Sequence, residues 1–570
     1  MKKYILSAFS VLFLCSSCVD TSLLPTDRTV DEDFWQTKEE VSSMVNGAYK
    51  GMLNESVVAN LIAWGDLRSD ELEPNPNVFS STTQKLDEIH SVNIQPSNPY
   101  ADWSSLYAVI NTCNIVLERA NGVRSIDPNY TEGDYESDCS QMLALRSLCY
   151  FYLVRAYRDV PYITKAFMNS SQDRLVSQSA PDSVLAGCIS DLERARKGAL
   201  DPAAYTVGDW KSRGIINRDA IDALLADIYL WRAAATHNTT YYQQCVNYCD
   251  EVIASKKANH PFSRHDLGTK DYYLSNGDEA YGDIFISQNS EESIFELQYD
   301  GTSNSNSALC KFYYKFGNNN SSQGFMKATS IFGSSGISAP VFINANDYRY
   351  ANAVYQPNSS DVNFDVKKMI SMQRDNSASA KADRARAFDH FEQNFIIYRL
   401  ADVMLMKAEA LTALATANDD PGLRQAFNLV QTVNTRSLDP QNYSDSLKWN
   451  TYSNVEAMEK LVLAERQREL CFEGKRWYDL MRYNYRHLDH VLDYTKTFAQ
   501  LVEAGVDIPK NYKEMLNLMA RKYVSGSDAM KAKMRTEAHL YMPVPYSDMQ
   551  VNKKLVQNPV YNSDSEYERN

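Results

Sequence analysis

The sequence has no long hydrophobic run after its first residues. No window approaches the roughly 18 apolar residues that a membrane-spanning helix needs, so the body is not predicted to be an integral membrane protein. Basic residues are fewer than acidic ones: 58 Lys and Arg against 72 Asp and Glu give a net charge of −14. Because no cluster of Lys and Arg supplies a basic surface for phosphates, we expect no nucleic-acid partner.

The chain is also poor in motifs that form disulfide frameworks or bind metals. Its 10 cysteines are scattered, and we interpret those in the body as buried free thiols. Cys245 and Cys249 share a helix face, but no histidine pair at ligand spacing accompanies them, and His487 and His490 lack the pattern of a zinc protease. We therefore predict no cofactor and no metal. Only the acidic loop at 278–283 leaves a calcium site open, without the ligand spacing of an EF-hand.

The first 17 residues have the pattern of a secretory signal. Two lysines at positions 2 and 3 precede an apolar run over 4–14, and two serines precede Cys18. This exit resembles a bacterial lipobox, by which Cys18 would be lipidated and become the mature N-terminus. The alternative is a plain secreted protein cleaved near Ser17. Without residues 1–17 the net charge becomes −16, which fits a soluble domain tethered by acyl chains.

The body is predicted to be mainly α-helical, because apolar residues recur every three or four positions in many segments. These segments lie at 37–53, 103–121, 139–157, 181–197, 218–232, 239–254, 400–411, 423–434 and 456–472. Consecutive helices of this length joined by short breaks are typical of helical-hairpin repeats. Strand-like pieces are short, at 293–297 and 540–544.

Two stretches interrupt the helical pattern. Residues 65–100 contain four prolines with many Asn and Ser, and residues 257–395 are rich in Asn, Ser, Gly and Tyr. Because long polar, aromatic loops on a helical frame commonly carry function, we expect these loops to bind a ligand.

Several motifs spread along the chain belong together. They are Phe34-Trp35 with Asn46-Gly47-Ala48-Tyr49, Trp103 to Asn114, Leu145 to Pro161, Ala223 to Leu230, Glu291 to Glu296, Tyr398 to Ala410, Glu465 to Leu480, Pro543-Val544-Pro545 and Gln557 to Tyr561. In these motifs the sequence resembles the SusD/RagB family of bacterial outer-membrane nutrient-binding lipoproteins. The resemblance covers essentially all of 18–570. Cys471, where a small or aromatic residue is commoner, is its main departure within the body.

The resemblance implies a mainly α fold: a tetratricopeptide-like helical-hairpin scaffold with a long loop-rich ligand-binding face. It also implies a protein that is not an enzyme, is lipid-anchored in the outer membrane and is exposed at the cell surface. Its partners would be an oligosaccharide or polysaccharide and a TonB-dependent SusC-like barrel transporter. We expect a signal peptide over 1–17 and one folded unit over 18–570, divided into a helical scaffold with binding loops (18–256), a loop-rich ligand-binding region (257–395) and a C-terminal helical region (396–570).

The resemblance places ligand contacts in two regions. The loops before the Trp103 helix offer Arg68, Asp70, Asn75, Asn98 and Tyr100, and those after the strand at 293–297 offer Tyr299, Tyr313, Tyr314, Phe316 and Phe325. Aromatic rings suit the apolar faces of sugars, and amides or carboxylates suit their hydroxyls. In an alternating strand, Tyr314 and Phe316 would share a face that Tyr313 does not. We expect Trp103 to belong to the scaffold.

The segment Glu465–Asp479 packs carboxylates and arginines together. Two carboxylates are what a glycosidase needs, but interleaved arginines would keep both ionised, so we interpret the segment as a structural ion-pair network. Glycan capture is the preferred function. A peptide-binding uptake lipoprotein of the same fold and a secreted glycoside hydrolase are the alternatives. The sugar, its linkage and its length are left open.

Overall fold

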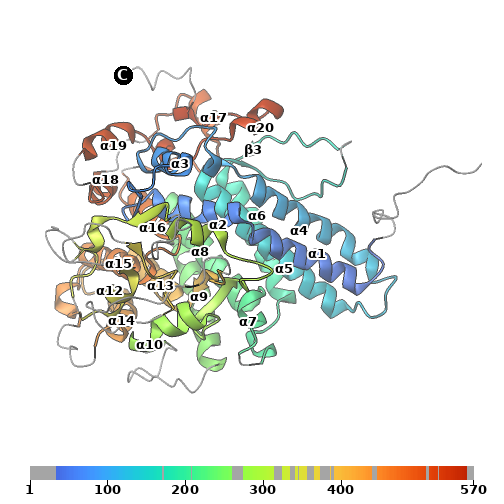
Figure 1. Ribbon diagram of the computed structural model, residues 1–570, viewed down its shortest axis with the longest axis horizontal. Coiled ribbons are helices and arrows are strands. Elements are labelled where there is room, and N and C mark those ends of the chain that lie inside the picture. Colours follow the sequence, from blue (N-terminus) through green and yellow to red (C-terminus); the bar gives the residue numbers. More distant parts are fainter. Residues whose placement is uncertain are drawn as a thin grey trace, which may run out of the picture.

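The fold is described from a computed structural model (Figure 1). The structure describes residues 34–561 except 170–171, 207, 260–273, 276, 314–323, 334–339, 345, 356–364, 373–385, 387–390, 440–445, 489, 509–512 and 524–525. The predicted signal peptide and Cys18 lie outside the described residues.

The long helices pack against one another largely in chain order. They are α1 (Lys38–Met52), α4 (Ser104–Val123), α5 (Glu132–Tyr157), α6 (Pro181–Gly198), α8 (Arg218–Thr236), α9 (Thr239–Asn259), α13 (Leu400–Leu414), α14 (Pro421–Arg436), α15 (Val455–Leu470) and α16 (Arg476–Arg486). Each of α4, α5, α6, α8 and α9 contacts the long helix before it, and α13 packs on α9, α14 and α15. This stack confirms the mainly α, helical-hairpin prediction.

Local sequence signals explain where these helices begin. Thr37 and Glu40 form a capping box before α1, and Thr131 and Asp134 form another before α5. The second box explains why α5 starts at Glu132, several residues before the apolar pattern over 139–157. From Cys139 to Tyr157 every residue of α5 is buried, so this helix lies at the centre of the stack.

Shorter helices fill the loop regions, and one prediction is corrected there. They are α2 (Glu55–Ile62), α3 (Ser81–His90), α7 (Lys211–Gly214), α10 (Gly277–Tyr281), α11 (Ser307–Tyr313), α12 (Tyr348–Ala353), α17 (Phe498–Glu503), α18 (Lys513–Ala520), α19 (Ser527–Lys533) and α20 (Tyr546–Val551). Residues 65–100, predicted as loop, contain the ten-residue helix α3. The prolines flank this helix without entering it, and Ser80 and Thr83 form its capping box.

The strands form four antiparallel pairs in the described part of the chain. These pairs are β1 (Leu72–Pro74) with β5 (Met326–Ala328), β2 (Val160–Pro161) with β3 (Gln178–Ser179), β4 (Ser293–Leu297) with β8 (Phe395–Arg399), and β6 (Val354–Tyr355) with β7 (Asp365–Val366). The strand predicted at 293–297 is confirmed. The one at 540–544 is wrong: Leu540 ends a short 3-10 helix, and the Met542 amide donates to the carbonyl oxygen of Ala156 at the end of α5 instead of joining a sheet.

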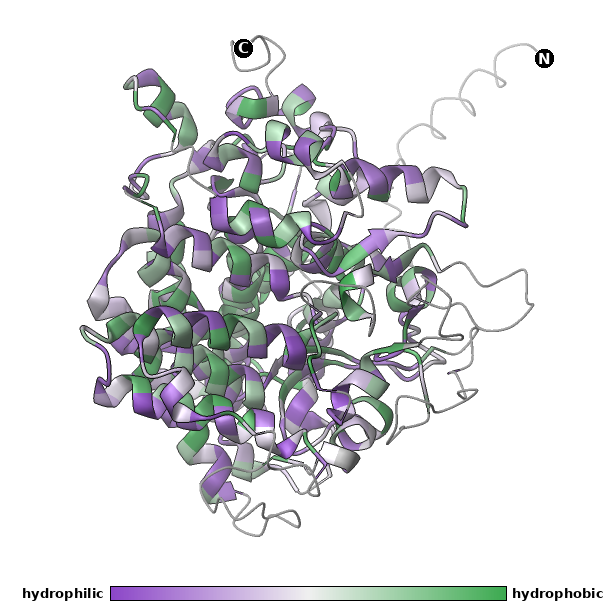
Figure 2. Cartoon of the chain, turned by 90° about the vertical axis from the view of Figure 1, so that its left-hand side faces the viewer, coloured by the Kyte–Doolittle hydropathy of each residue, from purple (hydrophilic) through white to green (hydrophobic). Residues whose placement is uncertain are grey.

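The C-terminal segment returns to the N-terminal third of the chain. Trp103 is buried, and its indole N–H donates to Asp548 Oδ2 at 2.7 Å, so the structure confirms it as scaffold. The buried apolar side chains form one continuous core that extends from Trp35 to Leu555. Figure 2 shows hydrophobic residues concentrated where helices pack together.

Two further predictions concern the core and the membrane. All eight cysteines within the described residues are buried and free, as the sequence predicted. None of the helices that the structure describes is both long and apolar enough to cross a bilayer.

Candidate ligand-binding face

The two loop regions that were predicted to bind a ligand meet in the structure. Strand β1, from the first region, pairs with β5, from the second, in the register Leu72 with Ala328. The Thr329 amide continues this contact by donating to the carbonyl oxygen of Glu71 at 2.9 Å. Segments about 250 residues apart in sequence are therefore fixed side by side.

Asn75 fastens the two segments at the end of the strand pair. Its backbone N–H donates to the Phe325 carbonyl oxygen at 2.8 Å, and its side-chain amide donates to the Gly324 carbonyl oxygen at 2.9 Å. Because Asn75 is buried, its side chain positions the neighbouring loops. Phe325 itself is half-buried, and its amide donates to the carbonyl oxygen of Lys311.

Asn98 orients Tyr100 in a similar way. The Asn98 side-chain oxygen accepts from the Tyr100 amide at 2.9 Å, and its side-chain amide donates to Glu88 Oε2 at 2.8 Å. The half-buried Tyr100 ring then packs on Phe312, with the ring centroids 6.0 Å apart. Burial raises the pKa of Tyr100 to about 12, so its hydroxyl remains protonated at neutral pH.

Phe79 is an aromatic residue of this region that the sequence analysis missed. Its side chain is 92% exposed, the most of any large hydrophobic residue in the described chain. The flanking turn is held by a hydrogen bond from the Val78 amide to the Asn75 carbonyl oxygen. In the sequence, this residue could have been noticed as a single phenylalanine between the turn residues Asn75-Pro76 and the capping box of α3. We define the binding face as the accessible rings of Phe79, Tyr100 and Phe325, supported by Asn75 and Asn98.

The structure places Arg68 and Asp70 beneath the surface. Arg68 donates to the His539 carbonyl oxygen at 2.9 Å, and its guanidinium carbon lies 4.3 Å from the centre of a Trp477 ring. Asp70 is fully buried and pairs with Arg476 at 2.8 Å. Burial pushes the pKa of Asp70 upward, but the Arg476 guanidinium outweighs it and holds that pKa below its usual range. Both side chains thus connect the first loop region to the C-terminal region.

Of the other residues predicted in the second region, two are buried and two lie outside the described residues. Tyr299 is buried, and its hydroxyl donates to the Leu53 carbonyl oxygen at 3.1 Å. Tyr313 is also buried, which raises its pKa well above the usual value. Tyr314 and Phe316 lie outside the described residues. The strand alternation expected for these aromatics does not begin at Tyr313, because that residue ends the helix α11.

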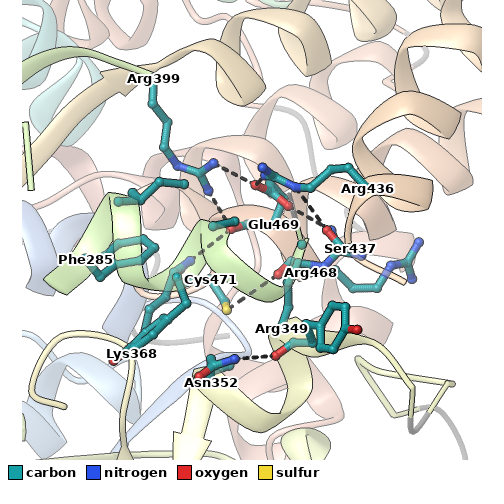
Figure 3. A pocket seen from close by; sticks show the side chains of 16 residues that line it. Phe285, Arg349, Asn352, Lys368, Arg399, Arg436, Ser437, Arg468, Glu469 and Cys471 are labelled. Carbon is teal, nitrogen blue, oxygen red and sulfur yellow. Dashed lines mark hydrogen bonds and ion pairs between the residues drawn. The ribbon is translucent and has the colours of Figure 1, made fainter. Parts of the chain in front are cut away.

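The charged segment 465–479 forms a buried ion-pair network, as predicted, and several of its partners come from other elements (Figure 3). Arg468 pairs with Glu465 at 2.8 Å and not with Glu469. Glu469 accepts from Arg399 at 2.6 Å, from Arg349 at 2.9 Å and from Arg436. These three arginines come from β8, α12 and α14, so Glu469 joins three elements to α15.

This network offers no proton donor for glycoside hydrolysis. Burial pushes the pKa of Glu469 upward, but Arg436 and Arg399 outweigh it and hold the pKa well below its usual range; Arg349 does the same more weakly for Glu465. A glycosidase acid needs the opposite shift. The adjoining cavity holds only about 40 Å³, room for a water molecule and not for a sugar ring.

The histidines and cysteines considered in the sequence do not gather into a metal centre in the part of the chain that the structure describes. Nowhere in that part do three or more His, Cys, Asp or Glu side chains form a group that could hold a metal ion. His487 instead lies 2.8 Å from Glu459 Oε2.

Comparison with known proteins identifies the fold and the family. A model of the SusD family matches residues 344–561, and a model described as starch-binding associating with outer membrane matches residues 24–230. SusD-like protein P38 of Formosa agariphila is 24% identical over 509 residues, which cover 84% of this chain and 90% of that protein.

Solved structures of other proteins have a similar fold. A SusD superfamily protein from Bacteroides thetaiotaomicron has a TM-score of 0.64 and 19% identity, over 93% of this chain and 99% of that one. A laminarin-binding SusD-like protein has a TM-score of 0.63 and 20% identity, over 92% of this chain and 99% of that one. The solved structures show the fold, and the two family models, which match opposite halves of the chain, show that it belongs to the SusD/RagB family.

Proposed function

We propose that this protein is a cell-surface lipoprotein that captures an oligosaccharide or polysaccharide and delivers it to a TonB-dependent outer-membrane transporter. The binding face carries the first part of this proposal. Two loop regions are fixed together by β1 and β5, and they present Phe79, Tyr100 and Phe325 at an accessible surface. Aromatic rings with amides beside them suit the apolar faces and hydroxyls of sugars.

Relatives support a glycan as the ligand. One matched family model is described as starch-binding, and one similar structure is of a laminarin-binding protein. Membrane attachment through Cys18 and partnership with a barrel transporter rest on the sequence resemblance. The same is true of Tyr314 and Phe316, which stay predicted ligand contacts and lie outside the described residues.

A glycan array followed by calorimetry tests the proposal. We expect the wild-type protein to bind at least one glycan, and Phe79→Ala and Tyr100→Ala each to weaken that binding about tenfold, the equivalent of about 1.4 kcal/mol. Tyr546→Ala is the matched control, because Tyr546 is a 58% exposed aromatic residue on α20, outside the binding face. It should leave the affinity unchanged.

Three results would contradict the proposal. They are binding of peptides from a library with no glycan bound, turnover of a polysaccharide by the purified protein, and glycan binding that neither aromatic variant alters. A thermal melt of each preparation separates lost contacts from lost folding. The melting temperature of Phe79→Ala should match wild type, since its side chain is almost fully exposed.

A further inference from the structure

A cavity of about 550 Å³ lies apart from the binding face. It is enclosed by the C-terminal half of α1, by α7 with the residue before it, and by the segment 296–304 that includes the end of β4. Its volume is in the usual range for small-ligand sites, roughly 300–1,000 Å³. None of the residues that define the binding face lines it, and Tyr299 is the one predicted contact that does.

Trp210 is the most exposed of the apolar side chains that line this cavity. Its side chain is 49% exposed, although tryptophan is among the most hydrophobic residues. Gly214 explains its position: a Cβ atom there would lie 2.7 Å from the indole Cε3 and 2.6 Å from Gln298 Cγ. Because glycine has no Cβ, one part of the indole rests against the α7 backbone while the rest stays accessible.

The short helix α7, which directly follows Trp210, is held in place by Arg213 and by backbone hydrogen bonds to Trp210. The buried Arg213 donates through Nε to the Ser290 carbonyl oxygen at 3.0 Å and pairs with Glu291 at 2.9 Å. The amides of Arg213 and Gly214 both donate to the Trp210 carbonyl oxygen. The indole therefore occupies its place before any ligand arrives, which lowers the entropic cost of binding.

Polar groups suited to hydroxyls surround the indole. Within the described chain, the side chains of Asn46, Lys50 and Asn304, which line the cavity, make no hydrogen bond or ion pair. Asp300 is oriented by its own loop, because its Oδ1 accepts from the amides of Thr302 and Asn304. The lining thus presents two free amides, the Lys50 ammonium group and the Asp300 carboxylate, together with the buried Glu296, which accepts from Asn394.

We propose that this cavity is a second carbohydrate subsite, which binds a neutral sugar ring with its apolar face on Trp210. The ring hydroxyls would be met by Asn46, Lys50, Asp300 and Asn304. Amide and carboxylate groups around one half-exposed indole match a pyranose, which has an apolar face and a polar edge. The inference rests on the proposed function in that the ligand is a glycan, and it adds a location outside the binding face.

Trp210→Ala tests the subsite by calorimetry with a glycan that the array identifies. We expect about tenfold weaker binding of the longest oligosaccharide and a melting temperature close to wild type, because the indole is half exposed. Tyr546→Ala is again the control. Gly214→Ala should weaken the same binding by displacing the indole without removing it.

A second readout observes the indole directly. In protein labelled with 5-fluorotryptophan, the fluorine resonance of Trp210 is the one missing from the Trp210→Phe spectrum. It should shift when the bound glycan is added and stay fixed with the peptide library.

The outcomes separate this inference from the proposed function. Glycan binding that depends on Phe79 and Tyr100, with normal affinity in Trp210→Ala and an unmoved Trp210 resonance, overturns the subsite alone. No glycan binding by the wild-type protein and no shift of the resonance overturn both. A shift with peptides but not with sugars overturns the carbohydrate assignment.

Discussion

Glu537, in a short 3-10 helix near the C-terminus, is a single carboxyl group in an unfavourable environment. Its side chain is almost fully buried, and this burial raises its pKa to about 7 although Arg158 opposes the shift. The folded protein therefore keeps a proton on Glu537 in the range of about pH 4.5 to 7, where the unfolded chain has lost it. Because the folded state binds more protons there, this group makes the free energy of unfolding fall as the pH rises through that range.

Glu537→Gln removes this dependence. We expect the stability of the variant relative to wild type to increase between about pH 4.5 and 7, by up to about 1.4 kcal/mol per pH unit. Urea unfolding at several pH values measures it. Glu503→Gln, at an exposed glutamate of α17, is the control and should follow the wild-type profile. Parallel pH profiles of Glu537→Gln and wild type would show that Glu537 does not titrate in this way.

Single residues of the binding face also show what sequence can and cannot predict. The resemblance predicted both loop regions as ligand-binding, yet it could not distinguish the buried Asn75 and Asn98 from the half-buried Tyr100. The burial of Asn75 depends on the strand pair β1–β5, a contact between segments far apart in sequence, and that of Asn98 on its packing against α3. Phe79 was missed because one aromatic residue in a loop has no periodicity to reveal it.

At the scale of elements, the network around Glu469 joins α12, α14 and β8 to α15. Glu469→Gln would leave the buried Arg399 and Arg436 and the partly buried Arg349 short of their counter-charge. We expect it to destabilise the protein by about 3–5 kcal/mol, measured by chemical unfolding. Glu456→Gln is the matched control on the same helix, because Glu456 is exposed and pairs with Lys460 four residues on. That control should leave the unfolding midpoint unchanged.

A folded Glu469→Gln protein of normal stability would mean that the arginines are satisfied without this carboxylate. A stable variant that had lost a measurable hydrolytic activity would instead favour a catalytic role. The ion-pair network was foreseeable from composition, since carboxylates and arginines alternate over 465–479. Its partners were not, because Arg349, Arg399 and Arg436 approach from other elements.

Helices were predicted more reliably than other elements. The apolar pattern of α8 and α13 repeats over several turns, so a single residue that departs from it does not hide the helix. The run 540–544 is only five residues long and contains Pro543, and the Met542 amide donates to a carbonyl oxygen near the end of α5 instead of joining a sheet. Helix α3 was hidden by the prolines on either side of its capping box.

At the scale of the whole molecule, the proposed lipid anchor can be tested apart from the fold. Cys18→Ala should release the protein from the membrane fraction while its circular dichroism and melting temperature stay as in wild type, because acyl chains are the only hydrophobic anchor that the sequence suggests. Cell fractionation followed by immunoblotting measures the release. Retention in the outer membrane, also in a strain without the neighbouring barrel transporter, would contradict lipidation at Cys18.

The return of the C-terminal segment to the N-terminal third has a consequence for the order in which this protein can be made. Arg68 binds the carbonyl oxygen of His539, Trp103 binds Asp548, and the end of α5 receives the amide of Met542. A ribosome delivers the first of each pair long before the second. The start of α4 and the end of α5 therefore lack these partners until the segment 539–548 has been synthesised, and a chain that stops short of residue 539 forms none of the three contacts.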